Sequence, residues 1–203
     1  MDKIRAFRPF LEIYSLHPST KEIFLNKRIC YNDSVFDFTS TLKEIVKNSD
    51  KVHQNVVEVT FITHGYISNI RRDKIPEMRN SILDLHKRET NKLRIVVLLD
   101  WRAASGSYNF LIYFIILKNV RTISKWLAKF AVSIKQDEQL ATKNIFIHAI
   151  GHSLGAHLMG MCSKEAFKNT QIKPFDRISG LDPAGPGIDT KMSFCLKSTD
   201  APM

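Results

Sequence analysis

The sequence lacks any apolar run long enough to cross a membrane as a helix. Its longest run, residues 110–117, contains eight apolar residues, whereas a membrane-spanning helix needs roughly 20. Residues 1–9 also lack the continuous apolar core that a secretory signal peptide requires. The sequence alone therefore predicts no transmembrane segment, and no signal peptide is visible in it.

Cysteine is scarce. The chain has three cysteines, and an odd number leaves at least one without a disulfide partner. Cys162 falls within a predicted helix and reads as a small buried apolar residue. Cys30 and Cys195 stand in polar, loop-like surroundings, and a disulfide between them is not favoured.

Acidic residues are outnumbered. Thirty basic against 20 acidic residues give a net charge of +10, which favours anionic partners such as a lipid headgroup surface or nucleic acid. The sequence has no zinc-finger spacing and no basic arm with interleaved aromatic residues, so we expect no nucleic-acid partner. We also expect no metal and no cofactor.

Strand and helix patterns alternate along most of the chain. A hydrophobic fraction of 44% and a charged fraction of 25% are ordinary for a globular protein, and 203 residues predict a single domain spanning residues 1–203. We expect a polar, irregular N-terminal part over about residues 1–50, with short strands near residues 22–25, and a core over residues 56–203. Within that core we predict strands over residues 56–62, 93–99, 144–150 and 175–181, and helices over residues 76–88, 108–135 and 156–166. This alternation is typical of the α/β class with a mostly parallel central sheet.

The long predicted helix has two distinct faces. Apolar residues recur at three- and four-residue steps along one face: Ile116, Val120, Ile123, Leu127, Phe130 and Ile134. Basic residues follow the opposite face: Lys118, Arg121, Lys125 and Lys129. The basic face is either a membrane-surface contact or the solvated outside of a core-packed helix, and the second interpretation is favoured.

Residues 151–155 read GHSLG and carry the most specific signal in the chain. An apolar, β-branched stretch precedes them and a helical stretch follows, so Ser153 falls on a strand-to-helix corner. A serine at such a corner is the nucleophile elbow of the α/β-hydrolase fold. The residues two before and two after the serine must be small for strand and helix to pass, and Gly151 and Gly155 meet that need. His152 lies directly beside the serine and is expected to support the elbow.

A serine nucleophile needs donors for the oxyanion that forms when it attacks a carbonyl. The backbone N–H of Leu154 follows the nucleophile at the start of a helix, where such a donor is expected. In this fold the second donor comes from the loop after an earlier strand. Residues 64–66 (HGY) occupy that place, and Gly65 permits close approach, so the N–H of Tyr66 is the candidate.

Asp182 is the best candidate for the catalytic acid. It closes the strand that follows the elbow unit, where catalytic groups gather in open α/β sheets, and it follows Ser153 in the order serine, acid, histidine. Asp100 also closes a strand, but it precedes the serine, and a capping or loop-fixing role explains it.

The base is missing from the pattern. The seven histidines all precede Asp182 and none follows it; they are His17, His53, His64, His86, His148, His152 and His157. Each that lies near the motifs has a structural explanation: within the elbow strand, beside the nucleophile, in the following helix or in the oxyanion loop. The triad is therefore incomplete in this sequence.

Four blocks together resemble the animal pancreatic-lipase family, with the closest likeness to its insect branch, which includes the venom phospholipases A1. The blocks are residues 61–66 (FITHGY), 100–102 (DWR), 151–157 (GHSLGAH) and 180–186 (GLDPAGP). Their order and approximate spacing agree over about residues 20–203. The resemblance implies a secreted esterase that acts on phospholipids or acylglycerols at a membrane or lipid interface. It also implies Ser153 as nucleophile, Asp182 as acid, and Tyr66 and Leu154 as oxyanion donors.

The chain departs from that family in three ways. Family members carry a signal peptide, several disulfides, and a catalytic histidine, lid and facing loop that come after the acid. We therefore expect a chain truncated at its C-terminus that lacks both ends of a family member and is by itself nearly inactive. The function expected from the sequence is phospholipase A1-like cleavage of the 1-acyl ester, with a triglyceride lipase as the related possibility. The alternatives are a non-catalytic lipid-binding or storage protein on the same scaffold, or a remnant too incomplete to fold stably.

Overall fold

The computed structural model describes residues 8–49, 56–72, 74–89, 91–105, 110–185 and 195–202, with the side chains of residues 86–88, 110–115 and 117 outside the description. The described strands form a six-stranded sheet in the order β2-β1-β4-β3-β5-β6. Their bounds are β1 (Phe10–Leu16), β2 (Ile23–Cys30), β3 (Val56–Thr63), β4 (Leu93–Asp100), β5 (Asn144–His152) and β6 (Arg177–Leu181). Strands β4, β3, β5 and β6 run parallel, and β1 pairs antiparallel with both β2 and β4. The predicted α/β-hydrolase class with a mostly parallel sheet is confirmed.

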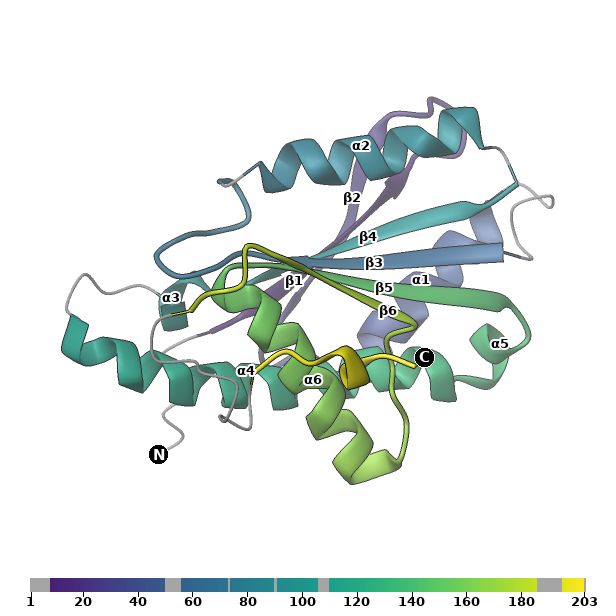
Figure 1. Ribbon diagram of the computed structural model, residues 1–203. Coiled ribbons are helices and arrows are strands. Elements are labelled where there is room, and N and C mark those ends of the chain that lie inside the picture. Colours follow the sequence, from purple (N-terminus) through teal and green to yellow (C-terminus); the bar gives the residue numbers. More distant parts are fainter. Residues whose placement is uncertain are drawn as a thin grey trace.

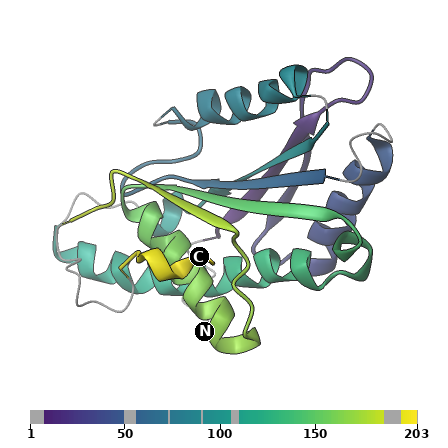
Figure 2. The ribbon, with the colours of Figure 1, turned by 45° about the vertical axis from the view of Figure 1, so that its right-hand side comes forward.

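Helices cover both faces of this sheet (Figures 1 and 2). Their bounds are α1 (Val35–Asn48), α2 (Ile75–Arg88), α3 (Arg102–Ser105), α4 (Phe110–Gln136), α5 (Glu138–Ala141) and α6 (Leu154–Thr170), with a 3-10 turn at Ser198–Asp200. Helix α2 lies on one face, while α1, α4 and α6 lie on the other (Figure 1). Each face has its own buried apolar cluster, and the larger one lies beneath α1, α4 and α6.

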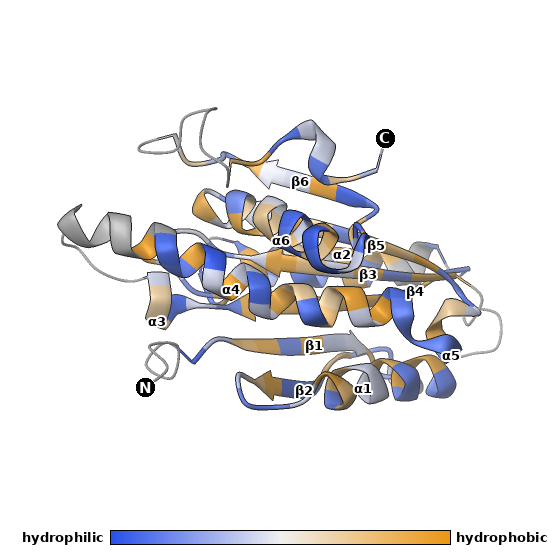
Figure 3. Cartoon of the chain, turned by 90° about the horizontal axis from the view of Figure 1, so that it is seen from below, coloured by the Kyte–Doolittle hydropathy of each residue, from blue (hydrophilic) through white to orange (hydrophobic). Residues whose placement is uncertain are grey.

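Strand β4 is the most deeply buried element, as its continuous apolar sequence predicts. All eight of its residues are buried, because β1 and β3 flank it and helices cover both of its faces. Figure 3 shows the matching hydropathy pattern, in which the inner strands are mostly hydrophobic and α4 alternates between hydrophobic and hydrophilic stretches.

The N-terminal part is not irregular, and this expectation was wrong. Residues 10–48 form β1, β2 and α1. Strand β1 is hard to recognise because it carries a charged residue, Glu12, in the middle of an apolar segment; the carboxylate is fully buried and is paired with Arg28 and Arg71. Helix α1 has a polar composition, but Ser34 and Asp37 form a capping box at its start, which stabilises the first turn.

Among the smaller predictions, the start of the last strand was wrong, and the expectation of no Cys30–Cys195 disulfide is confirmed. The last strand begins at Arg177, not at Phe175, because the Asp176 carboxylate accepts a hydrogen bond from the main-chain N–H of Ile147 at 2.7 Å and Phe175 turns into the core. The three cysteines are all free. Residues 106–109 and 186–194 lie outside the description, and with them the predicted start of the long helix and the last residue of the 180–186 block.

The parallel register brings the candidate residues to one edge of the sheet. Thr63 at the end of β3 is level with Leu99 on β4 and with Gly151 on β5. Gly151 is in turn level with Gly180 on β6. The residues that follow these strand ends therefore meet at the same edge, although the sequence separates them by many residues.

Candidate active site

Ser153 occupies a strained corner between β5 and α6. Its backbone angles are φ 53° and ψ −120°, a conformation that residues with a Cβ rarely adopt. The preceding residue ends β5 and the following residue begins α6. Its side chain is half-buried. The structure therefore places Ser153 in the geometry that the sequence pattern predicts for a nucleophile elbow.

The two glycines of the motif are required by contacts within the corner. A Cβ on Gly151 would lie 2.3 Å from the carbonyl oxygen of Gly155, and a Cβ on Gly155 would lie 2.5 Å from the carbonyl oxygen of His64. Real Cβ atoms do not approach backbone oxygens so closely. The glycines thus allow the strand, the helix and the loop after β3 to meet at Ser153. His152 is half-buried beside them, and its Nδ1 is buried without a hydrogen-bond partner in the described structure.

The loop after β3 touches the nucleophile directly. A Cβ on Gly65 would lie 2.8 Å from Cβ of Ser153 and 3.3 Å from its Oγ, so the Gly65 backbone passes against the serine. Tyr66 follows and is half-buried. On the other side, Leu154 is fully buried as the first residue of α6, where backbone N–H groups have no partner within the helix.

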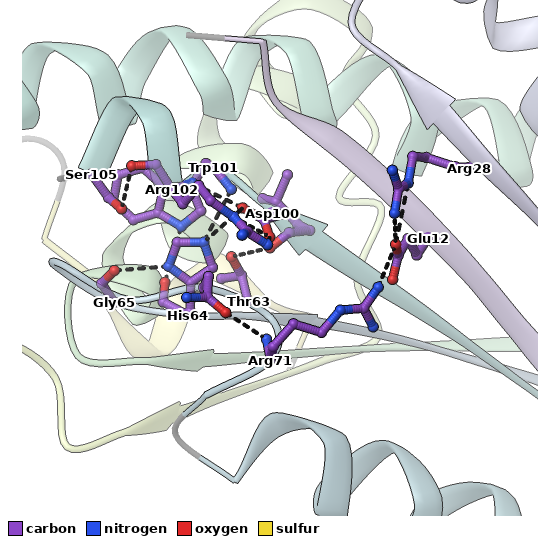
Figure 4. Close-up of polar contacts among 12 residues, drawn as sticks. Glu12, Arg28, Thr63, His64, Gly65, Arg71, Asp100, Trp101, Arg102 and Ser105 are labelled. Carbon is purple, nitrogen blue, oxygen red and sulfur yellow. Dashed lines mark hydrogen bonds and ion pairs between the residues drawn. The ribbon is translucent and has the colours of Figure 1, made fainter. Parts of the chain in front are cut away.

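His64 and Trp101 are interlocked behind that loop (Figure 4). The imidazole Nε2 accepts a hydrogen bond from the main-chain N–H of Trp101 at 3.0 Å, and the indole Nε1 of Trp101 donates to the carbonyl oxygen of His64 at 3.0 Å. The ring Nδ1 of His64 is 2.9 Å from the carbonyl oxygen of Gly65. The rings stack, with centroids 5.4 Å apart and planes 13° apart. Nothing in the sequence signals this arrangement, because 37 residues separate the partners.

Asp100 fixes the turn that begins with Trp101. Its carboxylate accepts hydrogen bonds from the main-chain N–H and the guanidinium of Arg102, and it lies 3.6 Å from Nε2 of His64. Burial alone would raise the pKa of this carboxyl, but the hydrogen bonds and the positive charge of Arg102 hold the pKa well below its usual range. Asp100 therefore stabilises a loop and does not contact Ser153, in line with the loop-fixing role expected from the sequence.

Asp182 lies next to the elbow but is exposed. It follows β6 with a left-handed backbone, φ 44°, and it has no polar partner among the described residues. The preceding residue, Leu181, accepts a hydrogen bond from the main-chain N–H of Ser153 at 2.8 Å. The structure thus brings the candidate acid and the candidate nucleophile to neighbouring strand ends.

His157 holds the segment after Asp182 against α6. Its Nε2 is 2.9 Å from the carbonyl oxygen of Ala184, and its Nδ1 accepts from the main-chain N–H of Leu196 at 3.0 Å. Burial lowers the pKa of His157 despite the hydrogen bond to Ala184, so the ring stays neutral near pH 7. This is the packed role that the sequence indicates.

None of the described histidine rings hydrogen-bonds to Ser153. His64 and His157 are engaged as above, and His17 accepts from the main-chain N–H of Thr20 in a surface turn. His148 contacts the hydroxyl of Ser179 at 2.9 Å, and burial with the nearby charge of Arg177 lowers its pKa to about 4. His53 and the side chain of His86 lie outside the described residues. The described part of the chain therefore shows no base for the nucleophile.

Other features of the described region bear on cofactors and membranes. It contains no cluster of three or more histidine, cysteine, aspartate or glutamate side chains that could hold a metal ion. No described helix is long and apolar enough to span a bilayer.

The basic face of α4 is a separate feature. Lys118, Arg121, Lys125 and Lys129, which form this face, are all exposed, and Arg121 forms an ion pair of 2.9 Å with Glu165 of α6. The solvated outer face of a core-packed helix stays the favoured interpretation of these residues, and a membrane-surface contact stays the alternative.

Comparison with known proteins gives consistent matches. The family described as Lipase matches residues 17–203. Phospholipase A1 2 of Dolichovespula maculata is 33% identical over 166 residues, which cover 78% of this chain and 51% of that protein. Phospholipase A1 of Polybia paulista is 30% identical over 155 residues, which cover 73% of this chain and 45% of that protein. The chain spans about half the length of these curated relatives.

Proposed function

This chain belongs to the Lipase family, and on that premise we propose that it carries the nucleophile, the acid and the oxyanion donors of a phospholipase A1-like ester hydrolase. The observation that carries the proposal is the strained corner at Ser153 with the Gly65 backbone packed against it. A protein that only binds lipid gains nothing from such a corner, because an unfavourable backbone conformation persists only where the surrounding structure enforces it.

The proposed chemistry is acyl transfer to Ser153. The serine Oγ attacks the ester carbonyl of the lipid, and the main-chain N–H groups of Leu154 and Tyr66 bind the oxyanion that forms. The ester C–O bond then breaks: the lysophospholipid leaves as an alcohol, protonated by the general base that took the serine proton, and the acyl group stays on Ser153. Water then hydrolyses this acyl-enzyme, which releases the fatty acid and frees the serine. Placing the donors on backbone, with Leu154 at the start of α6, supplies them without any reorganisation at the moment of reaction.

Asp182 would orient and stabilise the general base. A carboxylate in this role hydrogen-bonds to an imidazole, holds its tautomer and stabilises the imidazolium that forms. The exposed position of Asp182, next to the elbow, leaves its oxygens accessible to such a ring. Because the relatives are about twice as long as the matched region, we propose a histidine from that additional length as the base.

The proposed substrate is the 1-acyl ester of a phospholipid at a lipid interface, and the proposed location is outside the cell. The names of the relatives support the substrate, and the family supports a lipid ester in general. The net charge of +10 supports attraction to an anionic interface.

The test is Ser153→Ala in the complete protein, with release of the 1-acyl chain from phosphatidylcholine vesicles as the measurement. Losing a triad serine lowers turnover by about 10⁶, so hydrolysis should fall to background. Ser40→Ala, a matched serine on α1 far from the elbow, should retain full turnover. Unchanged hydrolysis in Ser153→Ala would refute the proposal.

A non-catalytic lipid-binding protein is the second candidate. The observation that favours it is the absence of a histidine contact to Ser153 among the described residues. If the complete protein binds anionic vesicles but releases no fatty acid from any phospholipid or acylglycerol offered, this candidate replaces the hydrolase.

A further inference from the structure

The hydrogen bonds around His64 determine which of its ring nitrogens carries the proton. The main-chain N–H of Trp101 can only donate, so Nε2, at 3.0 Å, must be the acceptor. A neutral imidazole then carries its proton on Nδ1, and this N–H donates to the carbonyl oxygen of Gly65 at 2.9 Å. The ring is fully buried, so water does not compete for either bond.

The carbonyl that His64 holds belongs to the same peptide unit as the N–H of Tyr66. A trans peptide is planar, and its C=O and N–H point in opposite directions; the described chain has no cis peptide bond. Fixing the oxygen of Gly65 therefore fixes the direction of the Tyr66 N–H. A glycine has little rotational preference of its own, so the peptide that follows Gly65 needs an external constraint to keep one orientation.

We propose that His64 is a positioning residue for the oxyanion hole: its Nδ1–H holds the Gly65 carbonyl and so aims the N–H of Tyr66 at the substrate oxygen. This inference rests on the proposed function, since it assigns a partner to one of the proposed oxyanion donors. The contact of the Gly65 backbone with Ser153 places the constrained peptide beside the nucleophile, where a change in its orientation affects turnover.

Trp101 is the support for the ring. Its main-chain N–H holds Nε2, and its indole N–H returns to the carbonyl of His64, so the imidazole cannot rotate without breaking bonds on both sides. The stacked indole, itself fully buried, blocks the remaining freedom of the ring. The block at residues 100–102 thus acts on the oxyanion loop through His64 and does not contact the substrate.

The test uses two substitutions in the complete protein, each of which removes the hydrogen bond of one of the two ring nitrogens. The amide nitrogen of asparagine reaches about as far as Nδ1 of histidine, so His64→Asn keeps a donor for the Gly65 carbonyl and loses the acceptor for Trp101. His64→Gln reaches about as far as Nε2, so it keeps an acceptor for Trp101 and loses the donor for Gly65. Each variant loses one of the two hydrogen bonds that the His64 ring makes, so we expect similar losses of stability in both. Similar urea midpoints would show that any difference in turnover does not come from a general loss of structure.

The proposal predicts a split in turnover on a soluble short-chain p-nitrophenyl ester. In His64→Gln, kcat should fall by about 10² with KM unchanged, because a lost oxyanion donor acts only on the transition state. In His64→Asn, kcat should stay within about threefold of wild type. Equal losses in both variants, or the larger loss in His64→Asn, would overturn the proposal.

Crystal structures of the two variants show the orientation of the Gly65–Tyr66 peptide directly, and this measurement does not require an active enzyme. The Gly65–Tyr66 peptide should keep its orientation in His64→Asn and turn in His64→Gln; an unchanged peptide in both would overturn the proposal. If hydrolysis survives Ser153→Ala, the proposed function fails, while the contrast between the two peptides still decides whether His64 orients the Tyr66 N–H.

Discussion

The main-chain N–H of Ser153 donates a hydrogen bond of 2.8 Å to the carbonyl oxygen of Leu181. Leu181 is level with His152 in the pairing of β5 with β6, so this bond continues the sheet by one step past the elbow. It joins the strand end that carries the proposed nucleophile to the one that carries Asp182. Their relative position therefore depends on the sheet itself and not on loop packing.

The backbone strain at Ser153 should be measurable as stability. We expect Ser153→Gly to raise the free energy of unfolding by about 1 kcal/mol over Ser153→Ala, because glycine adopts φ 53° with ψ −120° without a Cβ clash. Urea unfolding of the two variants measures the difference. Both lack the hydroxyl, so the comparison isolates the backbone. Equal midpoints would mean that the corner is unstrained.

Gly151 should not tolerate even a methyl group. We expect Gly151→Ala to lower the free energy of unfolding by about 3 kcal/mol, because its Cβ would meet backbone atoms of Gly155 at 2.3 and 2.4 Å. Gly185→Ala is the matched control, since nothing lies within 4 Å of a Cβ there, and it should change stability by less than about 0.5 kcal/mol. Similar midpoints for the two variants would contradict this packing of strand against helix.

The buried carboxylate of Glu12 should contribute more to the free energy of unfolding than exposed carboxylates do. It is fully buried and pairs with Arg71 at 2.8 Å and with Arg28, so Glu12→Gln removes the charge that compensates two guanidinium groups. We expect a loss of about 3 kcal/mol in the free energy of unfolding. The exposed Glu22→Gln should leave the chemical-denaturation midpoint unchanged. An unchanged free energy of unfolding in Glu12→Gln would show that the two arginines find other partners.

The lowered pKa of Asp100 predicts that the free energy of unfolding falls in a defined acid range. Its pKa is below the unfolded value of about 3.9, so its contribution to stability is present above pH about 4 and is lost as pH falls toward the lower, folded pKa. We expect Asp100→Asn to be about 2 kcal/mol less stable than wild type at pH 7. The gap should narrow as the pH falls below about 4.

Urea midpoints from pH 2 to 7 measure this gap. Asp182→Asn is the control, because it makes the same change at an exposed site that has no polar partner within the described part of the chain, and asparagine tolerates a left-handed backbone as well as aspartate does. A gap for Asp100→Asn that does not change with pH would show that the loss comes from geometry and not from the charge.

Predictions from sequence succeeded where one local pattern dominates. The apolar run of β4, the periodic face of α4 and the strand–GHSLG–helix unit each have a single favourable local structure, and each element is found. They failed at β1, where burial of Glu12 depends on Arg28 and on Arg71, which lie 16 and 59 residues away. A charged residue can be buried inside a strand only with such partners, and the sequence around β1 does not show that they are present.

The sequence by itself determined the fold class, the position of the serine corner and the residues proposed to act there, because turn geometry and hydrophobic periodicity are local properties. Only the tertiary structure decided that Gly65 lies against Ser153, that Trp101 holds the ring of His64 and that His157 joins α6 to the segment after Asp182. These contacts depend on strand order and register, which place distant strand ends side by side. Strand order follows from how the sheet buries its apolar faces as a whole, and no short segment of sequence specifies it.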